Sequence, residues 1–235
     1  MAVWVMHQRW THLLFAHWPV PAQALRPLLP PALTLDTFEG EAWVGVIPFH
    51  MSNVRPRGIP PLPWLSAFHE LNVRTYVRLG DRQGVWFFSL DASNPLAVRA
   101  ARAAVHLPYY DARMRMTVGP DGSVAYDSDR AHRGAPAASF RAAYRPDGDV
   151  YRARPGTLEH FLVERYELFA AAPRGLIHVK IAHPPWPLQR AVARIERNTM
   201  AGPAGIGLEA EPAQLHFARR VDVRTWLPAT VERQR

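Results

Sequence analysis

Three polar side chains, Glu70, Asn72 and Arg74, occupy alternate positions in an otherwise apolar run, FHELNVRTYV. Side chains two residues apart in a β-strand lie on the same face, so a strand here would place all three together. A carboxyl can transfer a proton, an amide can donate and accept hydrogen bonds, and a guanidinium can bind a carboxylate through two parallel bonds. If this face points inward, it can form a ligand site. The alternative is an ion-pair network that only closes the core.

The strand that carries these residues is predicted to be the first half of a hairpin. The turn signal GDRQG follows at 80–84, and a second β-rich run returns over 85–90. This spacing predicts two antiparallel strands joined by a loop of intermediate length. The rest of the fold has to hold this hairpin so that its polar face is covered.

The remaining chain is also predicted to be mostly β. Runs of β-branched and aromatic residues predict strands over 10–18, 34–38, 42–54, 112–118, 175–181, 189–198 and 214–226. One helix begins at the Asn94-Pro95 cap and ends near Val105, a second covers 157–169, and a short one can occupy 22–29. Many strands with few helices indicate an α+β, mostly β fold, which we expect to form a single domain over 1–235.

A proline-rich segment, RPRGIPPLP at 55–63, precedes the hairpin. Proline removes a backbone donor and favours an extended, stiff chain. We therefore expect this segment to run over the surface as a connector, with a ligand for SH3-type domains as the alternative.

The composition excludes several classes of protein. Cysteine is absent from the 235 residues, which excludes disulfides, thiolate zinc sites and cysteine nucleophiles. No apolar run approaches the roughly 20 residues that span a bilayer, so we expect a cytoplasmic protein without a membrane partner. The formal charge of +8 suggests an anionic partner, yet the arginines are scattered beside acidic residues. We therefore do not expect nucleic acid as the partner, and a polyanion bound at the surface is an outside alternative.

Several histidines raise the question of a metal site; they are His12, His17, His69, His106, His178 and His183. No pair has the spacing of four residues that places two ligands on one face of a zinc-binding helix, and no cysteine supports such a site. We therefore expect scattered core and surface histidines and no metal. Glycine-rich phosphate-binding patterns are missing as well, so no cofactor is expected.

Six ordered blocks of sequence carry a family resemblance: WTHLLFAHWPV, LLPPALTLDTFEGEAWVGVIPF, FHELNVRTYV, GVWFFSLDA, LPYYDARM and HPPWPLQ. Together they resemble the YqjF-like family of uncharacterised bacterial proteins, which is similar to the acetoacetate decarboxylase superfamily. The resemblance covers residues 8–228. It implies a closed, cone-shaped acetoacetate-decarboxylase-like β-barrel with an interior cavity and a few short helices.

The same resemblance gives a reason not to expect the decarboxylase's Schiff-base chemistry in this chain. In the decarboxylase, a cavity lysine forms a Schiff base with a β-keto acid, and a second lysine lowers the pKa of the first. By motif position, its Pro-Lys-Lys corresponds to Pro108, Tyr109 and Tyr110 in this chain. Neither tyrosine can form an imine, and Lys180, the single lysine of the chain, matches no family motif. We therefore do not expect a Schiff-base decarboxylase.

Other parts of the decarboxylase site have counterparts here. Glu70 resembles its cavity glutamate, and Arg9 resembles its substrate-binding arginine. The resemblance thus implies a small organic anion, an acid or a carbonyl compound, held by Arg9 and oriented by Asn72 and Arg74. Tyr109 or Tyr110 would fill the former lysine position.

Two functions fit this site. In a lysine-independent enzyme, Glu70 would be the catalytic group that transfers a proton. In a non-catalytic binding or sensing module, the same side chains would only hold the ligand. The sequence leaves the choice open, and it also leaves open whether the protein is a homo-oligomer.

Overall fold

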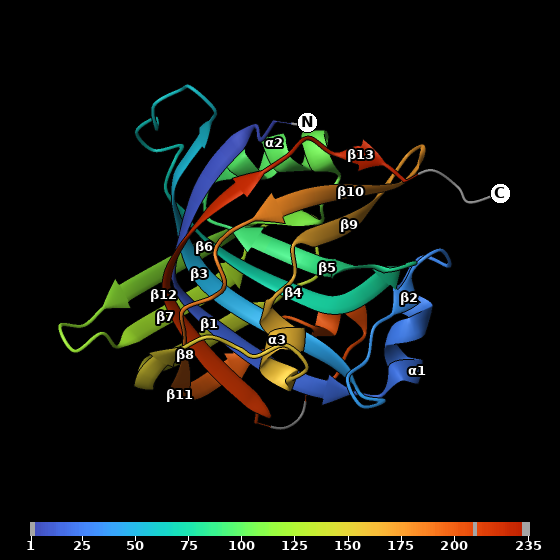
Figure 1. Ribbon diagram of the computed structural model, residues 1–235. Coiled ribbons are helices and arrows are strands. Elements are labelled where there is room, and N and C mark those ends of the chain that lie inside the picture. Colours follow the sequence, from blue (N-terminus) through green and yellow to red (C-terminus); the bar gives the residue numbers. More distant parts are fainter. Residues whose placement is uncertain (1–2, 209–210, 232–235) are drawn as a thin grey trace.

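The computed structural model describes residues 3–208 and 211–231 (Figure 1). Its strands are β1 Met6–Val20, β2 Thr34–Leu35, β3 Ala42–Pro56, β4 Phe68–Leu79, β5 Arg82–Ala92, β6 Tyr109–Val118, β7 Val124–Arg130, β8 Ser139–Tyr151, β9 Glu167–Ala172, β10 Gly175–Ala182, β11 Leu188–Asn198, β12 Gln214–Thr225 and β13 Ala229–Thr230. Its helices are α1 Ala22–Leu25, α2 Pro95–Val105 and α3 Leu158–Val163, with 3₁₀ turns η1 Arg26–Leu28 and η2 Gly202–Ala204. The prediction of a mostly β chain with a few short helices is confirmed.

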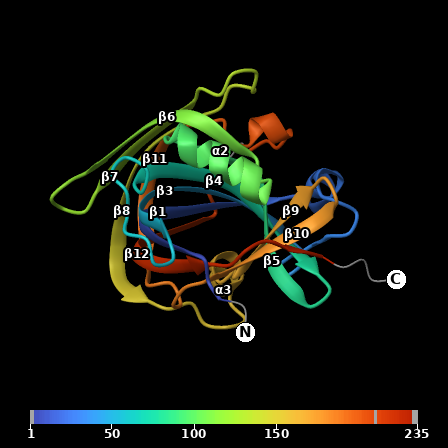
Figure 2. The same ribbon diagram turned by 90° about the horizontal axis from the view of Figure 1, so that it is seen from above.

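The strands of the described residues form one sheet that closes on itself (Figures 1 and 2). One ring runs from β4 through β5, β6, β7, β8, β11, β12, β1 and β3 back to β4. A second path leaves β5 for β9 and β10 and returns to β12, so β12, β1, β3, β4 and β5 belong to both rings. Of these five strands, β4 is buried along most of its length.

Each face of β4 packs into a different part of the core. Leu71 and Val73 join a cluster that contains Tyr126 of β7 and residues of β8. Phe68 and Tyr76 join a second cluster with Phe15 of β1 and the buried side of α3. Because side chains alternate along a strand, the polar residues between Phe68 and Tyr76 face this second cluster.

Several predicted elements differ in extent; for example, the strand predicted over 34–38 covers only Thr34–Leu35, and two further differences concern the hairpin and the second helix. The hairpin loop is shorter than predicted: β4 and β5 pair from Leu79 and Arg82, and Gly80 has a positive φ of 58°. The predicted helix over 157–169 ends at Val163, and its last part is strand β9. The reason is tertiary pairing, because Leu168 lies between β5 and β10 and gains a hydrogen-bonding partner on both sides.

Helix α2 connects two parallel strands. The Asn94 side chain accepts hydrogen bonds from the Leu96 and Ala97 amides, as the predicted cap requires. The helix crosses from β5 to β6 and sets them parallel, with Leu90 opposite Tyr109. This crossover places Tyr109 on β6, and only β5 lies between β6 and β4 in the sheet.

A buried ion pair joins β5 to β7. Arg130 donates two hydrogen bonds to Asp91, at 2.9 and 2.7 Å, and both side chains are almost completely buried. Such a pair adds little net stability compared with apolar residues at the same positions. Removing one partner, however, leaves an unpaired charge in the core.

We expect Arg130→Ala to lower the free energy of unfolding by about 3 to 5 kcal/mol, since it leaves the Asp91 carboxylate without its partner. Arg141→Ala is the matched control, because Arg141 pairs with Asp127 at the exposed surface. The control should cost no more than about 1 kcal/mol. Urea unfolding of both variants measures the difference, and equal losses would contradict this role for the buried pair.

Candidate functional site

The polar face of β4 is buried. Exposed fractions are 4% for Glu70, 5% for Asn72 and 9% for Arg74. Opposite them on β3 lie Phe49, Ile47 and Gly45, in the same register. The prediction that these three side chains share one face is confirmed, and that face points into the protein rather than into bulk water.

Glu70 lies where its carboxyl can take up or release a proton near neutral pH. The Tyr109 hydroxyl donates a hydrogen bond of 2.8 Å to the carboxyl. Burial raises the pKa of Glu70 to about 7; hydrogen bonds from Tyr109 and Asn72 oppose this increase, and the nearby charge of Asp91 adds to it. Tyr109, one of the two tyrosines that the resemblance places at the decarboxylase's lysine positions, thus faces a carboxyl.

Arg74 is a buried cation without a carboxylate partner among the described residues. Its guanidinium donates a hydrogen bond of 3.0 Å to the Leu162 carbonyl of α3. The guanidinium carbon also lies 5.8 Å from the Phe15 ring centre and 5.7 Å from that of Tyr76. The Nε atom is buried without a hydrogen-bond partner. Burying a charge in this way costs free energy, because the guanidinium loses its hydration.

A second buried arginine, Arg165, lies beside the same tyrosine. Its guanidinium carbon is 5.2 Å from the Tyr76 ring centre, and it pairs with Asp36 at 2.7 Å. One of its terminal nitrogens has no partner. The sequence did not indicate this residue as part of a site, because the pattern placed it within a helix that in fact ends two residues earlier.

His17 is a further residue near this site, which the sequence analysis had treated only as one of several scattered core and surface histidines. It is completely buried, and its Nε2 lies 2.7 Å from the Tyr76 hydroxyl. Burial, with the charge of Arg74 in second place, lowers the pKa of His17 well below its ordinary value, so the imidazole is neutral. Gly45 makes room for it: a Cβ at this position would lie 3.0 Å from the His17 ring.

Arg9 does not join this cluster. Its Nε donates to Asp222 at 2.9 Å, and its side chain is 32% exposed. The neighbouring Trp10 points the opposite way, with its ring 5.5 Å from that of Phe49 in the core. Since adjacent strand residues alternate, Arg9 lies on the outer face.

Tyr110 also lies apart from Glu70. Its ring packs against the Arg130 guanidinium, whose carbon is 4.1 Å from the ring centre. It also meets the His132 ring edge-on at 5.5 Å. Of the two tyrosines at the former lysine positions, the structure therefore brings only Tyr109 to the carboxyl.

The interior offers no amine for imine chemistry. Lys180, the single lysine of the sequence, is exposed on β10 with its nitrogen 5.6 Å from the Trp226 ring centre. Within residues 3–208 and 211–231, no three histidine or acidic side chains are grouped so as to hold a metal. The groups that the described residues bring together here are a carboxyl, a phenol, an amide and two guanidinium groups, with the His17 imidazole beside Tyr76.

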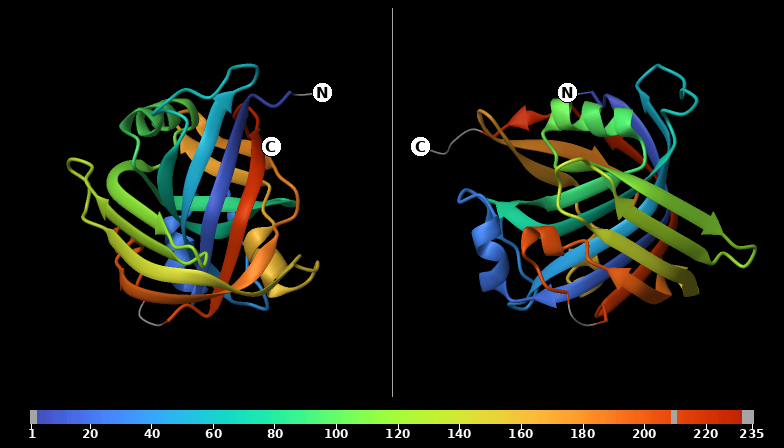
Figure 3. Two further views of the ribbon diagram at one scale, coloured as in Figure 1. Left: turned by 90° about the vertical axis from the view of Figure 1, so that its left-hand side faces the viewer. Right: turned by 180° about the vertical axis from the view of Figure 1, so that it is seen from behind.

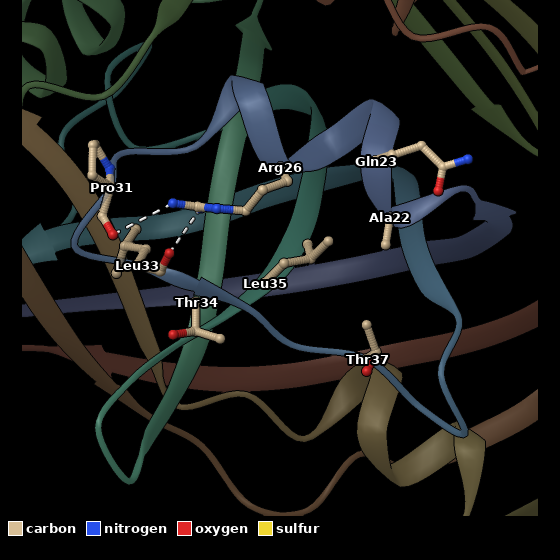
Figure 4. A pocket seen from close by; sticks show the side chains of 8 residues that line it. All are labelled: Ala22, Gln23, Arg26, Pro31, Leu33, Thr34, Leu35 and Thr37. Atoms are coloured by element: carbon tan, nitrogen blue, oxygen red, sulfur yellow. Dashed lines mark hydrogen bonds between the residues drawn. The ribbon is translucent and has the colours of Figure 1, made fainter.

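Two surface hollows lie away from these residues. One, of about 500 Å³, lies under α1 and η1, where the Arg26 guanidinium is already bound to the carbonyls of Leu33 and Pro31 (Figure 4). The other, of about 380 Å³, is lined in part by Arg190 and His216. Neither includes Glu70 or Arg74, so the central cavity stays a prediction.

The sequence of the chain matches a known family. The family model described as "Uncharacterized conserved protein", DUF2071, matches residues 7–222. The chain belongs to this family. It is also 42% identical over 224 residues to "Uncharacterized protein YqjF" of Bacillus subtilis (strain 168), covering 95% of this chain and 91% of that protein. The family resemblance seen in the sequence is confirmed.

Solved structures share the fold at low sequence identity. An acetoacetate decarboxylase-like enzyme from Sphingomonas wittichii RW1 matches with a TM-score of 0.64 and 14% identity, covering 97% of this chain and 93% of that chain. The enduracididine biosynthesis enzyme MppR complexed with pyruvate matches with a TM-score of 0.59 and 13% identity, covering 95% and 88%. These likenesses show an acetoacetate-decarboxylase-like fold. Among the described residues, no helix has the length and apolar character to cross a bilayer.

The raised pKa of Glu70 has a consequence for stability. A carboxyl with a higher pKa in the fold than its ordinary value of 4.5 binds more protons in the folded state between those two values, so ionisation destabilises the fold as the pH rises. Relative to wild type, Glu70→Gln should therefore gain roughly 3 kcal/mol of unfolding free energy between about pH 4 and pH 8.

Urea unfolding of wild type and Glu70→Gln across this range measures the gain. Because only the difference between the two proteins is used, the titration of the many histidines cancels. Glu41→Gln, which changes an exposed carboxyl, is the matched control. A difference that stays constant with pH would show that Glu70 is not held in its protonated form.

Proposed function

We propose that the inner face of β4 binds a small organic anion, with Arg74 as the residue that holds its carboxylate. The observation that carries this proposal is the buried Arg74 guanidinium, which has no carboxylate partner within the described residues and an unpaired Nε. Leaving a charge unpaired in an apolar core costs several kcal/mol, and a bound carboxylate would remove much of that cost. Arg9 is not included, because Asp222 already occupies it at the surface.

The spacing along β4 suits a small molecule. Glu70 and Arg74 are four residues apart, which is about 13 Å along a strand, and both side chains are long enough to reach toward each other. Asn72 lies between them, and its Oδ1 is buried without a partner. A short acid could thus place its carboxylate at Arg74 and its other end near Glu70, with Asn72 beside it.

Proton transfer is the chemistry that the carboxyl supports. A group with a pKa of about 7 is present in both protonation states at neutral pH, so it can accept a proton and return it. On a keto acid, the Glu70 carboxylate would remove a proton from the carbon next to the carbonyl. The Tyr109 hydroxyl could then donate to the enolate oxygen, and the protonated Glu70 would return the proton to carbon.

Keto acids are the first compounds to test. The MppR structure of the same fold is a complex with pyruvate, a three-carbon keto acid. In this chain, such a compound would have to react without an imine, since the lysine positions hold Tyr109 and Tyr110. The absence of cysteine supports a cytoplasmic setting, where keto acids are common metabolites.

Ligand binding should depend on Arg74 and not on Arg9. We expect pyruvate or a related keto acid to raise the melting temperature of wild type, since saturation at a hundredfold excess over Kd adds about 2.7 kcal/mol. Arg74→Met should abolish the shift, because it removes the carboxylate-binding group. Arg9→Met, a matched control for a surface arginine, should keep it. A shift that survives in Arg74→Met would rule out this placement of the anion.

Proton transfer can be tested by isotope exchange. We expect wild type to catalyse exchange of the methyl protons of pyruvate for deuterium in D₂O. Proton NMR measures this exchange as the loss of the methyl signal. Glu70→Gln should lose the exchange by about two to four orders of magnitude while the thermal shift persists, because the amide cannot accept the proton. Unchanged exchange in Glu70→Gln would remove Glu70 from the chemistry.

A binding or sensing module is the second candidate function. It is favoured by the packing around Glu70, which is 4% exposed and lies outside both surface hollows. In that case wild type would show the Arg74-dependent thermal shift without any exchange of substrate protons. The two measurements together therefore separate the two functions.

A further inference from the structure

The loop between β3 and β4 presents apolar side chains to solvent. Trp64 is 93% exposed, and three other apolar residues of the loop are exposed by 45% (Ile59), 51% (Leu62) and 37% (Leu65). Folded soluble proteins rarely leave a whole indole in water, because burying it is worth several kcal/mol. This loop carries the proline-rich segment that the sequence predicted to be a surface connector.

The backbone holds Trp64 in its exposed position. Its φ is +63°, a conformation that bulky residues seldom adopt, and its carbonyl accepts a hydrogen bond of 2.9 Å from the Asn94 side chain. On one side of it, the Leu62 amide donates to the Ser66 hydroxyl at 2.8 Å, and the Ser66 amide donates back to the Leu62 carbonyl. The Asn94 hydrogen bond therefore ties the loop to the start of α2, and the Leu62–Ser66 hydrogen bonds close the loop across the indole.

Helix α2 extends the same surface. The Asn94 contact places the start of α2 beside Trp64, and Leu96, two residues later, is 63% exposed. The views in Figures 1 and 3 show this loop and α2 at the end of the molecule that also holds the N-terminus. We call the five residues Ile59, Leu62, Trp64, Leu65 and Leu96 the apolar tip.

The charged side chains of the two segments that form the apolar tip are all positive. The loop from 55 to 67 contains Arg55 and Arg57 and no acidic residue, and α2 contains Arg99 and Arg102 and no acidic residue. The guanidinium carbons of Arg57 and Arg224 lie 5.0 Å and 5.5 Å from the centre of the Trp4 ring. Arg224 therefore adds a further positive charge at this end of the molecule. A second copy of the chain docked face to face would bring these arginines against one another, which disfavours a symmetric dimer through this surface.

We propose that the apolar tip is a docking surface for an anionic lipid bilayer. A tryptophan with aliphatic neighbours inserts at the level of the lipid headgroups, and surrounding arginines bind acidic headgroups. The expectation that the protein has no membrane partner rested on the absence of a spanning segment. Surface binding of this kind needs none, because only side chains of one loop and one helix enter the interface.

Co-sedimentation with vesicles tests this proposal. Wild type is expected to bind vesicles of phosphatidylcholine with phosphatidylglycerol, and to bind pure phosphatidylcholine vesicles much more weakly. Trp64→Ser and Leu62→Ser should each weaken binding by about tenfold or more, since each removes an inserted apolar group. Val150→Ser, at a 61% exposed valine of β8, is the matched control and should bind as wild type does.

Charge is tested separately. Arg57→Glu should weaken binding to the phosphatidylglycerol vesicles. Arg194→Glu, which changes an exposed arginine of β11, should not. Absence of vesicle binding by wild type overturns the proposal. Binding that is equal in wild type and both serine variants also overturns it, because it would reflect the net charge alone. A concentration-dependent dimer that Trp64→Ser dissolves, without vesicle binding, would assign the surface to a second copy.

Discussion

The polar side chains of β4 must find partners inside an apolar core, and much of the surrounding structure serves that requirement. Strand β4 is buried along most of its length, so the carboxyl, the amide and the guanidinium that it carries are all dehydrated. Tyr109 reaches Glu70 because the crossover through α2 sets β6 parallel to β5. Helix α3 reaches Arg74 with a backbone carbonyl.

These partners satisfy the site unequally. Burial raises the pKa of Glu70 to about 7, so this carboxyl can avoid a dehydrated negative charge by binding a proton. An arginine cannot do the same, because its guanidinium stays charged at any pH that the protein meets. Asp36 pairs with Arg165 and leaves Arg74 with one carbonyl and two ring faces. The positive charge of Arg74 beside a carboxyl that is only partly ionised at neutral pH is the electrostatic basis for proposing an organic anion as the ligand.

The sequence predicted this site only where local periodicity determines it. Alternation along β4 was enough to place Glu70, Asn72 and Arg74 on one face. Arg9 could not be placed in this way, because β1 changes register around His12, whose φ is +55°. On one side of that irregularity Trp10 faces the core, and on the other Phe15 does, so counting residues along the strand fails.

Contacts between distant segments were beyond prediction from the sequence. The pairing of Arg165 with Asp36 joins residues 129 positions apart, and no local pattern encodes it. The end of α3 was misjudged for the same reason, since the pairing of β9 with β5 and β10 overrides helical periodicity there. The exposure of Trp64 was missed too, because the predicted surface connector ended one residue earlier, at Pro63.

The protonation state of Glu70 at neutral pH can be observed directly. Difference infrared spectroscopy of wild type against Glu70→Gln isolates the carbonyl band of this one protonated carboxyl during a pH titration. Burial predicts that the band disappears with a midpoint near pH 7. A midpoint near 4.5, the ordinary value for glutamate, would mean that Glu70 is solvated and ionised, and would contradict a buried proton-transfer group on β4.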